Sequence, residues 1–324
     1  MPRLIDNEGP YFDQLQVGDV FTTAPSLTLT SGHAAVHQSI TGGRLRLSLD
    51  GHLSRSVSGV TLADPALVWD IAIGQSTTVT RRVVANLFYR GLAFRRLPAI
   101  GDTLRTRTEV VGLRQNASRP TGLAALRMTT TDQEDRLVLD FWRCAMLPLS
   151  SPGVRTGHDD DLSTIGQPVD MSPLLGQIAR WDLTRLPGPD ASAVAAGNAW
   201  EVRAGDVVSN APELARLTLN IAHVHHDRFS RESGRLVYGG HTIALALAQL
   251  TRTLPDLITV AGWHSCDHTG PVREGDTLVS AISVDDVAAT DGGERALTLR
   301  IRTSARRESG HDPVLDWRLI ALSR

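Results

Sequence analysis

The sequence predicts an α+β protein built from two tandem copies of one domain, each an antiparallel sheet wrapped around a central helix. Three features of the 324 residues predict this class: short motifs that recur in one order, an apolar helical stretch in each half, and long alternating strands after each stretch. A helix packed on a sheet is one of the stable layered arrangements of a domain. The length also favours two domains, at about 100–200 residues for each.

Three short motifs occur twice, in the same order, with offsets of 174 to 187 residues. Each match is weak alone, because Gly-Asp is a common pair in turns. Together the three matches indicate that the second half repeats the first. The pairs are GDTL at 101–104 and 275–278, VLD at 138–140 and 314–316, and GDV at 18–20 and 205–207.

The predicted elements follow the same order in each half. In the first half, residues 64–73 predict a central helix, and three alternating strands follow it: TLRTRTEVVGLR, LAALRMTTTDQ and RLVLDFWRCAMLPL. In the second half, GHTIALALAQL at 240–250 is apolar nearly all round, which is typical of a buried helix. The strands TLVSAISVDDV, RALTLRIRTSAR and PVLDWRLIALS then repeat the first three.

The two copies are separated by a segment of different composition. Residues 151–197 are rich in Pro, Gly, Ser and Asp, with SSPG, GHDDD and LPGPD as the clearest examples, so they predict a linker. We therefore expect an N-terminal domain at 1–150 and a C-terminal domain at 198–324. Two such domains would pair their sheets as the subunits of a homodimer do.

The composition argues against several classes of protein. With 33 Lys+Arg against 35 Asp+Glu, no basic face for nucleic acid is expected. No stretch approaches the ~18 apolar residues of a membrane span, and MPRLIDNEGPYFD lacks the apolar core of a signal peptide. Cys144 and Cys266 are too few for a disulfide framework or a Cys-based zinc site, and we expect buried thiols. We expect no membrane partner and a cytoplasmic location.

Several segments are similar to one known family. FDQLQVGDVF at 12–21 is similar to its opening strand, and the GDTL turn with the strand after it is similar to a later one. On these segments the chain resembles the MaoC-like dehydratases, the (R)-specific enoyl-CoA hydratase branch of the hot-dog families, over about 11–150 and 198–324. The resemblance implies two tandem hot-dog domains and a hydro-lyase that acts on an acyl-CoA thioester.

Further segments narrow the resemblance within this family. They are most similar to the fused two-domain mesaconyl-CoA hydratases, also called β-methylmalyl-CoA dehydratases. The supporting text is ANL at 85–87 with Tyr89, VGLRQN at 111–116 and VYGGH at 237–241.

The family's hydratase motif, Gly-Asp-x-Asn-Pro-(apolar)-His, has its catalytic Asp and His five residues apart. In the second half, LNIAHVH at 219–225 aligns with it, so that His225 falls on the motif's His and Asn220 on its Asp. In the first half, GGRLRLS at 42–48 keeps neither residue. The resemblance therefore implies that the second half is catalytic and that the first is a degenerate copy that shapes the acyl pocket.

Hydration of an enoyl thioester requires a base for the attacking water, a proton for the α-carbon and stabilisation of the thioester oxygen. His225 suits the first task, because an unperturbed imidazole titrates near pH ~6.5. The start of the apolar helix suits the third, since its N-terminus carries partial positive charge. In the family, the glycine that begins this helix donates to the thioester oxygen, and Gly240 matches it. We expect substrate contacts from Gly239, His241 and His268.

The source of the α-carbon proton is open. Asn220 cannot transfer a proton, although it can orient water or hydrogen-bond the substrate. Either His225 handles both proton transfers through the one water, or another group supplies the acid. The candidates are Asp227, His223, Asp267 and His268.

Three arginines, Arg90, Arg95 and Arg96, surround Phe94 just before the first GDTL turn. They are either a solvated charged edge or a contact to the phosphates of coenzyme A or to a substrate carboxylate, which Arg recognises bidentately. The aromatic content of 5% and the lack of an obvious long apolar groove favour a short acyl group over a fatty one. We therefore expect a short branched or carboxylated enoyl-CoA, with mesaconyl-CoA first.

The segment HVHHD at 223–227 is similar to a metal-binding cluster, but the sequence supplies no second, well-spaced ligand group. We expect no metal, and no cofactor apart from the coenzyme A of the substrate. The chain also has no GxSxG elbow, P-loop or GxGxxG after a strand, which argues against serine hydrolases, NTPases and dinucleotide dehydrogenases.

The predicted function is reversible hydration and dehydration of a short branched or carboxylated enoyl-CoA. Two alternatives remain: a hot-dog protein that binds acyl-CoA without turnover, and a dehydratase or thioesterase that acts on an acyl chain held by acyl carrier protein. His225 aligns with the histidine of the hydratase motif, and the apolar helix still begins with Gly-Gly. Both features favour an enzyme over a protein that only binds acyl-CoA. The lack of a carboxylate in 241–250 argues against a thioesterase. Whether the fused chain forms a homo-oligomer is open.

Overall fold

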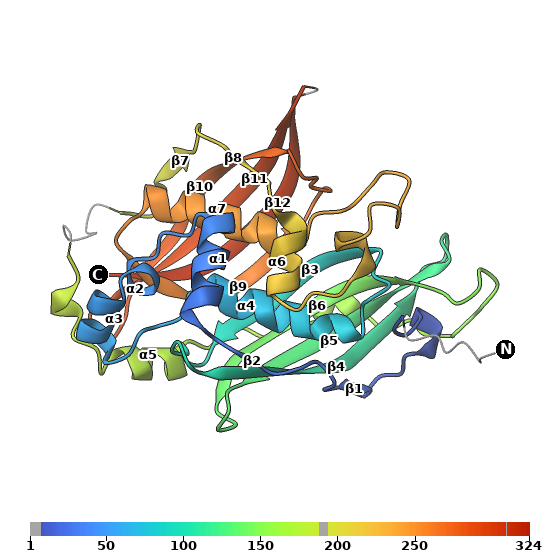
Figure 1. Ribbon diagram of the computed structural model, residues 1–324, viewed down its shortest axis with the longest axis horizontal. Coiled ribbons are helices and arrows are strands. Elements are labelled where there is room, and N and C mark those ends of the chain that lie inside the picture. The colour runs from blue at the N-terminus through green and yellow to red at the C-terminus, as the bar shows by residue number, and fades with distance from the viewer. Residues whose placement is uncertain (1–7, 188–193, 309) are drawn as a thin grey trace.

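Both halves of the chain contribute strands to one continuous antiparallel sheet (Figure 1). The computed structural model describes residues 8–187, 194–308 and 310–324, so residues 1–7, and residues 188–193 of the predicted linker, lie outside the described part. The first half supplies β1 (Val20–Phe21), β2 (Leu27–Thr28), β3 (Ala85–Phe94), β4 (Thr103–Gln115), β5 (Thr121–Thr131) and β6 (Leu137–Pro148). The second half supplies β7 (Ala199–Glu201), β8 (Asp206–Val207), β9 (Leu257–His268), β10 (Thr277–Ala289), β11 (Arg295–Arg307) and β12 (Gly310–Ser323).

The strand order repeats from one half to the other. The sheet runs β1-β4-β5-β6-β3-β9-β12-β11-β10-β7, with β2 beside β4 and β8 beside β10. Counted outward from the centre, β3-β6-β5-β4 therefore corresponds to β9-β12-β11-β10. The halves meet where β3 and β9 pair, from Phe88 opposite Asp267 to Ala93 opposite Gly262. This arrangement confirms the predicted α+β class with a double hot-dog fold.

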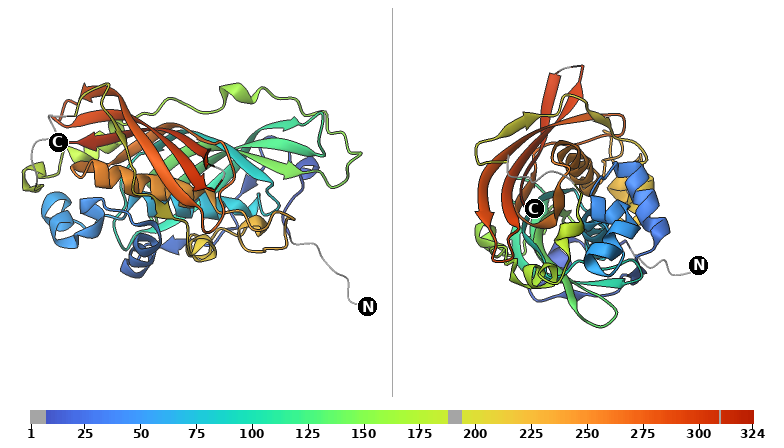
Figure 2. Two further views of the ribbon diagram at one scale, coloured as in Figure 1. Left: turned by 90° about the horizontal axis from the view of Figure 1, so that it is seen from above. Right: turned by 90° about the vertical axis from the view of Figure 1, so that its left-hand side faces the viewer.

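Two central helices lie on the inner side of the curved sheet (Figure 2). They are α4 (Pro65–Gln75), which is buried over its whole length, and α7 (Gly239–Thr253), which is buried over most of it. The start of α4 is specified locally, because the Asp64 side chain accepts a hydrogen bond of 2.8 Å from the Ala66 amide and Pro65 occupies the first helical position.

Further helices accompany the two central ones. In the first half they are α1 (Ser31–Thr41), which contacts α7, and α2 (Arg46–Leu49) and α3 (Gly51–Ser58), which contact each other while α2 also contacts β9. In the second half, α6 (Ala211–Leu217) lies against α1 (Figure 1). None of the described helices is long and apolar enough to cross a membrane.

The prediction of three strands after each central helix is one strand short. The structure has four, because β3 and β9 precede the three predicted strands in each half. In β9, Leu257–Trp263 is buried without interruption, so the segment lacks the alternation that marks a half-buried strand. The two strands that join the halves are thus the two that the polarity pattern does not predict.

The described part of the predicted linker packs on the sheet and has short elements of its own: η3 (Leu162–Thr164), α5 (Ser172–Ile178) and η4 (Leu183–Arg185). It crosses the junction of the halves at two glycines. A Cβ at Gly262 would lie 2.7 Å from a methyl carbon of Val169, and a Cβ at Gly91 would lie 3.0 Å from the amide nitrogen of Gln167. Glycine at these positions lets the chain approach the sheet closely.

Cys144 and Cys266 are buried free thiols, as expected. Burial raises the pKa of the Cys144 thiol to about 12. The thiol is therefore protonated at neutral pH and is a poor nucleophile.

We expect Gly74→Ala to destabilise the protein. A Cβ there would overlap the carbonyl oxygen of Thr218 and lie 2.7 Å from its carbonyl carbon, so α4 and the segment after α6 would have to separate. Overpacking of this kind costs roughly 1–3 kcal/mol. The matched control is Gly176→Ala in α5, where no atom lies within 4 Å of the added carbon. Urea unfolding should place the midpoint of Gly74→Ala clearly below that of the control, and equal midpoints would contradict this packing.

Candidate active site

A cavity of about 270 Å³ lies where the two halves meet. The first half lines it with the end of α4, the segment that follows, β3 and β6, and the second half with η6 (His223–His225), the start of α7 and the end of β9. Most of its polar lining comes from Thr77, Thr80, Asn86, Tyr89, Arg143, Asn220, His225, Arg231, Tyr238, Thr242 and His268. Of the sequence-predicted site residues, the structure therefore brings His225, Asn220, Gly239 and His268 together in this cavity.

His225 is held in the cavity wall as a neutral imidazole. Its Nδ1 lies 3.0 Å from the carbonyl oxygen of Leu236, which can only accept, so Nδ1 carries the proton and Nε2 is the basic nitrogen. Burial lowers the pKa of His225 to about 4. The ring is therefore unprotonated at neutral pH and can accept a proton through Nε2.

Asn220 uses its side-chain oxygen in the turn that leads to η6. That oxygen accepts a hydrogen bond of 3.0 Å from the Ala222 amide, and the backbone oxygen of Asn220 lies 2.6 Å from Nε2 of His226. The preceding residue, Leu219, has a positive φ of 61°. The amide NH₂ of Asn220 is thus the part of the side chain that can bind a ligand.

The start of α7 meets the cavity at Gly239, one residue before the predicted Gly240. A Cβ at Gly239 would lie 2.5 Å from Nε2 of His268, whereas a Cβ at Gly240 would overlap a carboxylate oxygen of Asp70. The side chain of the N-cap residue Tyr238 makes no capping hydrogen bond. The His241 amide donates a hydrogen bond of 3.0 Å to the carbonyl oxygen of Tyr238, so the amides of Gly239 and Gly240 are the first-turn donors left for an oxygen that gains negative charge.

Two predicted histidines differ in their surroundings. His268 lines the cavity, and its buried Nε2 has no partner among the described residues. His241 is fully buried behind the cavity, and neither of its ring nitrogens has a partner in the described part of the chain. Burial lowers the pKa of each to about 4.

One buried carboxyl group was missed by sequence reasoning. Asp70 of α4 lies 3.1 Å from Nε2 of His37 and accepts a hydrogen bond of 3.2 Å from the hydroxyl of Tyr238. Burial raises the pKa of Asp70. Tyr238 lines the cavity, and its ring centre lies 5.7 Å from that of His225. Because Asp70 contacts the hydroxyl of Tyr238, the first half places an acidic group directly behind this cavity-lining side chain.

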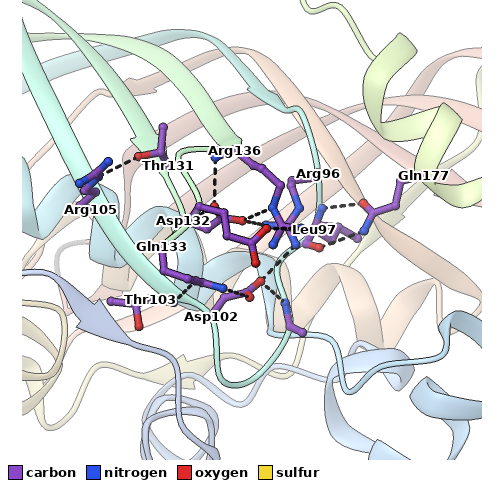
Figure 3. A network of polar contacts seen from close by, with 12 residues as sticks. Arg96, Leu97, Asp102, Thr103, Arg105, Thr131, Asp132, Gln133, Arg136 and Gln177 are labelled. Atoms are coloured by element: carbon purple, nitrogen blue, oxygen red, sulfur yellow. Dashed lines mark hydrogen bonds and ion pairs between the residues drawn. The ribbon is translucent and has the colours of Figure 1, made fainter.

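The structure does not bring the three predicted arginines to this cavity. Each forms an ion pair instead: Arg90 lies 2.7 Å from Asp267, and Arg95 lies 2.9 Å from Asp170. Arg96 lies between Asp102 and the buried Asp132 in the network of Figure 3. The cavity contains a different arginine, Arg143, which sequence reasoning missed because a single Arg in a strand usually faces solvent.

Of the proposed acids, only His268 lines the cavity. Asp227 is exposed, Asp267 pairs with Arg90, and His223 pairs with Glu8. The described residues contain no group of three or more His, Cys, Asp or Glu side chains that could hold a metal ion.

Comparisons with known proteins agree with this architecture. Among solved structures, a conserved hypothetical protein of Mycobacterium tuberculosis with a double hotdog fold has a TM-score of 0.90 and 53% identity, covering 99% of this chain and 100% of that one. The β-methylmalyl-CoA dehydratase of Chloroflexus aurantiacus is 29% identical and covers 93% of this chain and 89% of its own. The mesaconyl-CoA hydratase of Cereibacter sphaeroides is 26% identical, with 91% and 89% covered. No protein-family model matches.

The fold and the cavity define a class: fused double hot-dog proteins with a pocket between the two halves. The relatives identify the family within that class. The chain belongs to the MaoC-like dehydratase family of double hot-dog proteins, with distant homology to β-methylmalyl-CoA dehydratase and mesaconyl-CoA hydratase. This confirms the resemblance predicted from the sequence.

We expect His241→Leu to make stability less sensitive to acid. The pKa of His241 is about 4 in the fold and near 6.5 in an unfolded chain, so between these values the unfolded state binds a proton that the folded state does not. The contribution of His241 to the free energy of unfolding is therefore fully present above pH ~6.5 and is lost as the pH drops toward 4. The substitution should reduce this slope by about 1.4 kcal/mol per pH unit in urea titrations. An unchanged slope would contradict a neutral, buried His241.

Proposed function

We propose that the protein is a hydro-lyase that reversibly hydrates a short branched or carboxylated enoyl-CoA, with mesaconyl-CoA as the first candidate. The observation that carries the proposal is the neutral His225, whose basic nitrogen is available in a cavity that also receives the start of α7. The cavity of about 270 Å³ suits a short acyl group. The names of the two distant relatives point to the same class of substrate.

In the proposed reaction, Nε2 of His225 takes a proton from water as the water oxygen bonds to the β-carbon. The electrons of the double bond move toward the thioester carbonyl, and its oxygen gains negative charge. The first-turn amides of α7 and the partial positive charge of the helix start stabilise that oxygen. The imidazolium then gives the proton to the α-carbon, so one base serves both transfers. The NH₂ of Asn220 orients the water or the substrate.

One observation favours a second candidate, which is binding of acyl-CoA without turnover. The position of the family's catalytic Asp holds Asn220, which cannot exchange a proton. The two candidates differ in a simple assay. Loss of enoyl absorbance on mixing with crotonyl-CoA or mesaconyl-CoA reports hydration, and a thiol reagent run alongside reports thioester cleavage. Thioester cleavage without hydration would favour a thioesterase.

We expect His225→Ala to lower kcat by roughly 10²-fold or more, which is the range for loss of a general base. The matched control is His264→Ala on β9, because that side chain is exposed and outside the cavity. The control should turn over at the native rate. Near-native turnover by His225→Ala would show that the assignment of the base is wrong.

We expect kcat/KM to be at least about tenfold higher for mesaconyl-CoA than for crotonyl-CoA, which corresponds to about 1.4 kcal/mol of transition-state binding. The reason is that a carboxylate held by a buried cation adds a charge-assisted hydrogen bond that crotonyl-CoA cannot make. Equal kcat/KM values for the two substrates would contradict a preference for a carboxylated acyl group. They would not contradict hydration of other enoyl-CoA thioesters.

A further inference from the structure

Arg143 of β6 is the one arginine below a tenth exposed among the described residues, at 3%. It lines the cavity from the first half. Nη2 donates to two neutral oxygens, 2.6 Å to the hydroxyl of Thr80 and 3.3 Å to the carbonyl of Ser76. The neutral hydroxyl of Tyr89 is a further hydrogen-bonding neighbour of the guanidinium. Its Nε is buried and has no partner in the described part of the chain.

A buried guanidinium without an anion is an unusual state. Burial of a charge is costly unless the charge is paired and hydrogen-bonded. The neutral oxygens offset part of this cost, and one of them, the Ser76 carbonyl, lies at the C-terminus of α4, where a cation is favoured. They leave Nε unpaired, however, whereas Arg90, Arg95 and Arg96 all have carboxylate partners. The missing partner of Arg143 is therefore best supplied by a ligand.

We infer that Arg143 is the anchor of a carboxylate-binding subsite in the cavity, which holds the far carboxylate of a dicarboxylic acyl group. A carboxylate matches the guanidinium because two parallel N–H groups can donate to its two oxygens. The inference rests on the proposed function and deepens it, since it assigns the residue that selects the substrate class.

The neighbours of Arg143 fit this role. Tyr89 is its register partner on the adjacent strand β3, so both side chains project from the same face of the sheet. Tyr89 and Thr80 also line the cavity and carry hydroxyl groups that can donate to a carboxylate. These residues belong to the first half, whereas His225 and the start of α7 belong to the second. One half thus holds the far end of the acyl group and the other holds the thioester.

The cavity has a second arginine, Arg231, and the test must separate the two. Arg231 is partly exposed and donates to the carbonyl oxygen of Val84. Because Arg231 also lines the cavity, it is the other arginine that could bind the carboxylate of the acyl group.

Binding of two inert thioethers tests the subsite without any chemistry. Carboxypropyl-CoA and butyl-CoA differ only in that a carboxylate replaces a methyl group, and neither can be hydrated or cleaved as a thioester. Isothermal titration should show that the wild-type protein binds carboxypropyl-CoA at least about tenfold more tightly, which is a typical effect of a charge-assisted pair. Arg143→Gln should lose this preference while it still binds butyl-CoA.

The matched control is Arg127→Gln on the neighbouring strand β5, where the side chain pairs with Asp140 outside the cavity. It should keep the wild-type preference. If Arg143→Gln does not fold, Arg143→Lys provides the test. Lysine keeps the positive charge but lacks the two parallel N–H donors of the guanidinium, so the preference for carboxypropyl-CoA should weaken at least about threefold. Three results would overturn the subsite: no preference in the wild type, full preference in the Arg143 variants, or loss of preference in Arg231→Gln alone. The hydration assay with crotonyl-CoA tests the proposed function separately, since that substrate has no carboxylate.

Discussion

The pairing of β3 with β9 is the constraint on which the rest of the molecule depends. These two strands join the sheets of the halves, with Tyr89 opposite Cys266 near one end of the junction. The pairing also sets the ring centre of Tyr89 5.9 Å from that of His268, so the first half meets the end of β9 directly. Because the cavity takes one wall from each half, a change in this register would separate the groups that line it.

The two halves supply different parts of the candidate site. The second half provides His225, Asn220 and the start of α7. The first half provides Arg143, and behind the cavity wall it places Asp70 against Tyr238. Sequence comparison with the hydratase motif treats the first half as degenerate, because residues 42–48 keep neither the Asp nor the His. Its cavity residues nevertheless carry a buried cation and several hydroxyl groups, which is the chemistry expected of a specificity pocket.

The duplicated fold could be predicted because the repeated motifs lie in turns and strands that both halves share. The joining strands could not, because the buried part of β9 has no polar alternation to distinguish it from other apolar runs. The candidate base His225 was found through its register in a motif. Arg143 was not, because only the tertiary packing of β6 beneath the end of α4 shows that this side chain is buried. Arg95 looked free in the sequence because its partner Asp170 lies 75 residues away.

The central claim is that an acyl thioester lies between His225 and the start of α7, in the cavity between the halves. A crystal structure of the protein with carboxypropyl-CoA tests this most directly. The account predicts that the sulfur lies near the first turn of α7, that the adjoining carbons face Nε2 of His225, and that the carboxylate contacts Arg143. An alkyl chain bound outside this cavity, or within it but away from His225, would contradict the account.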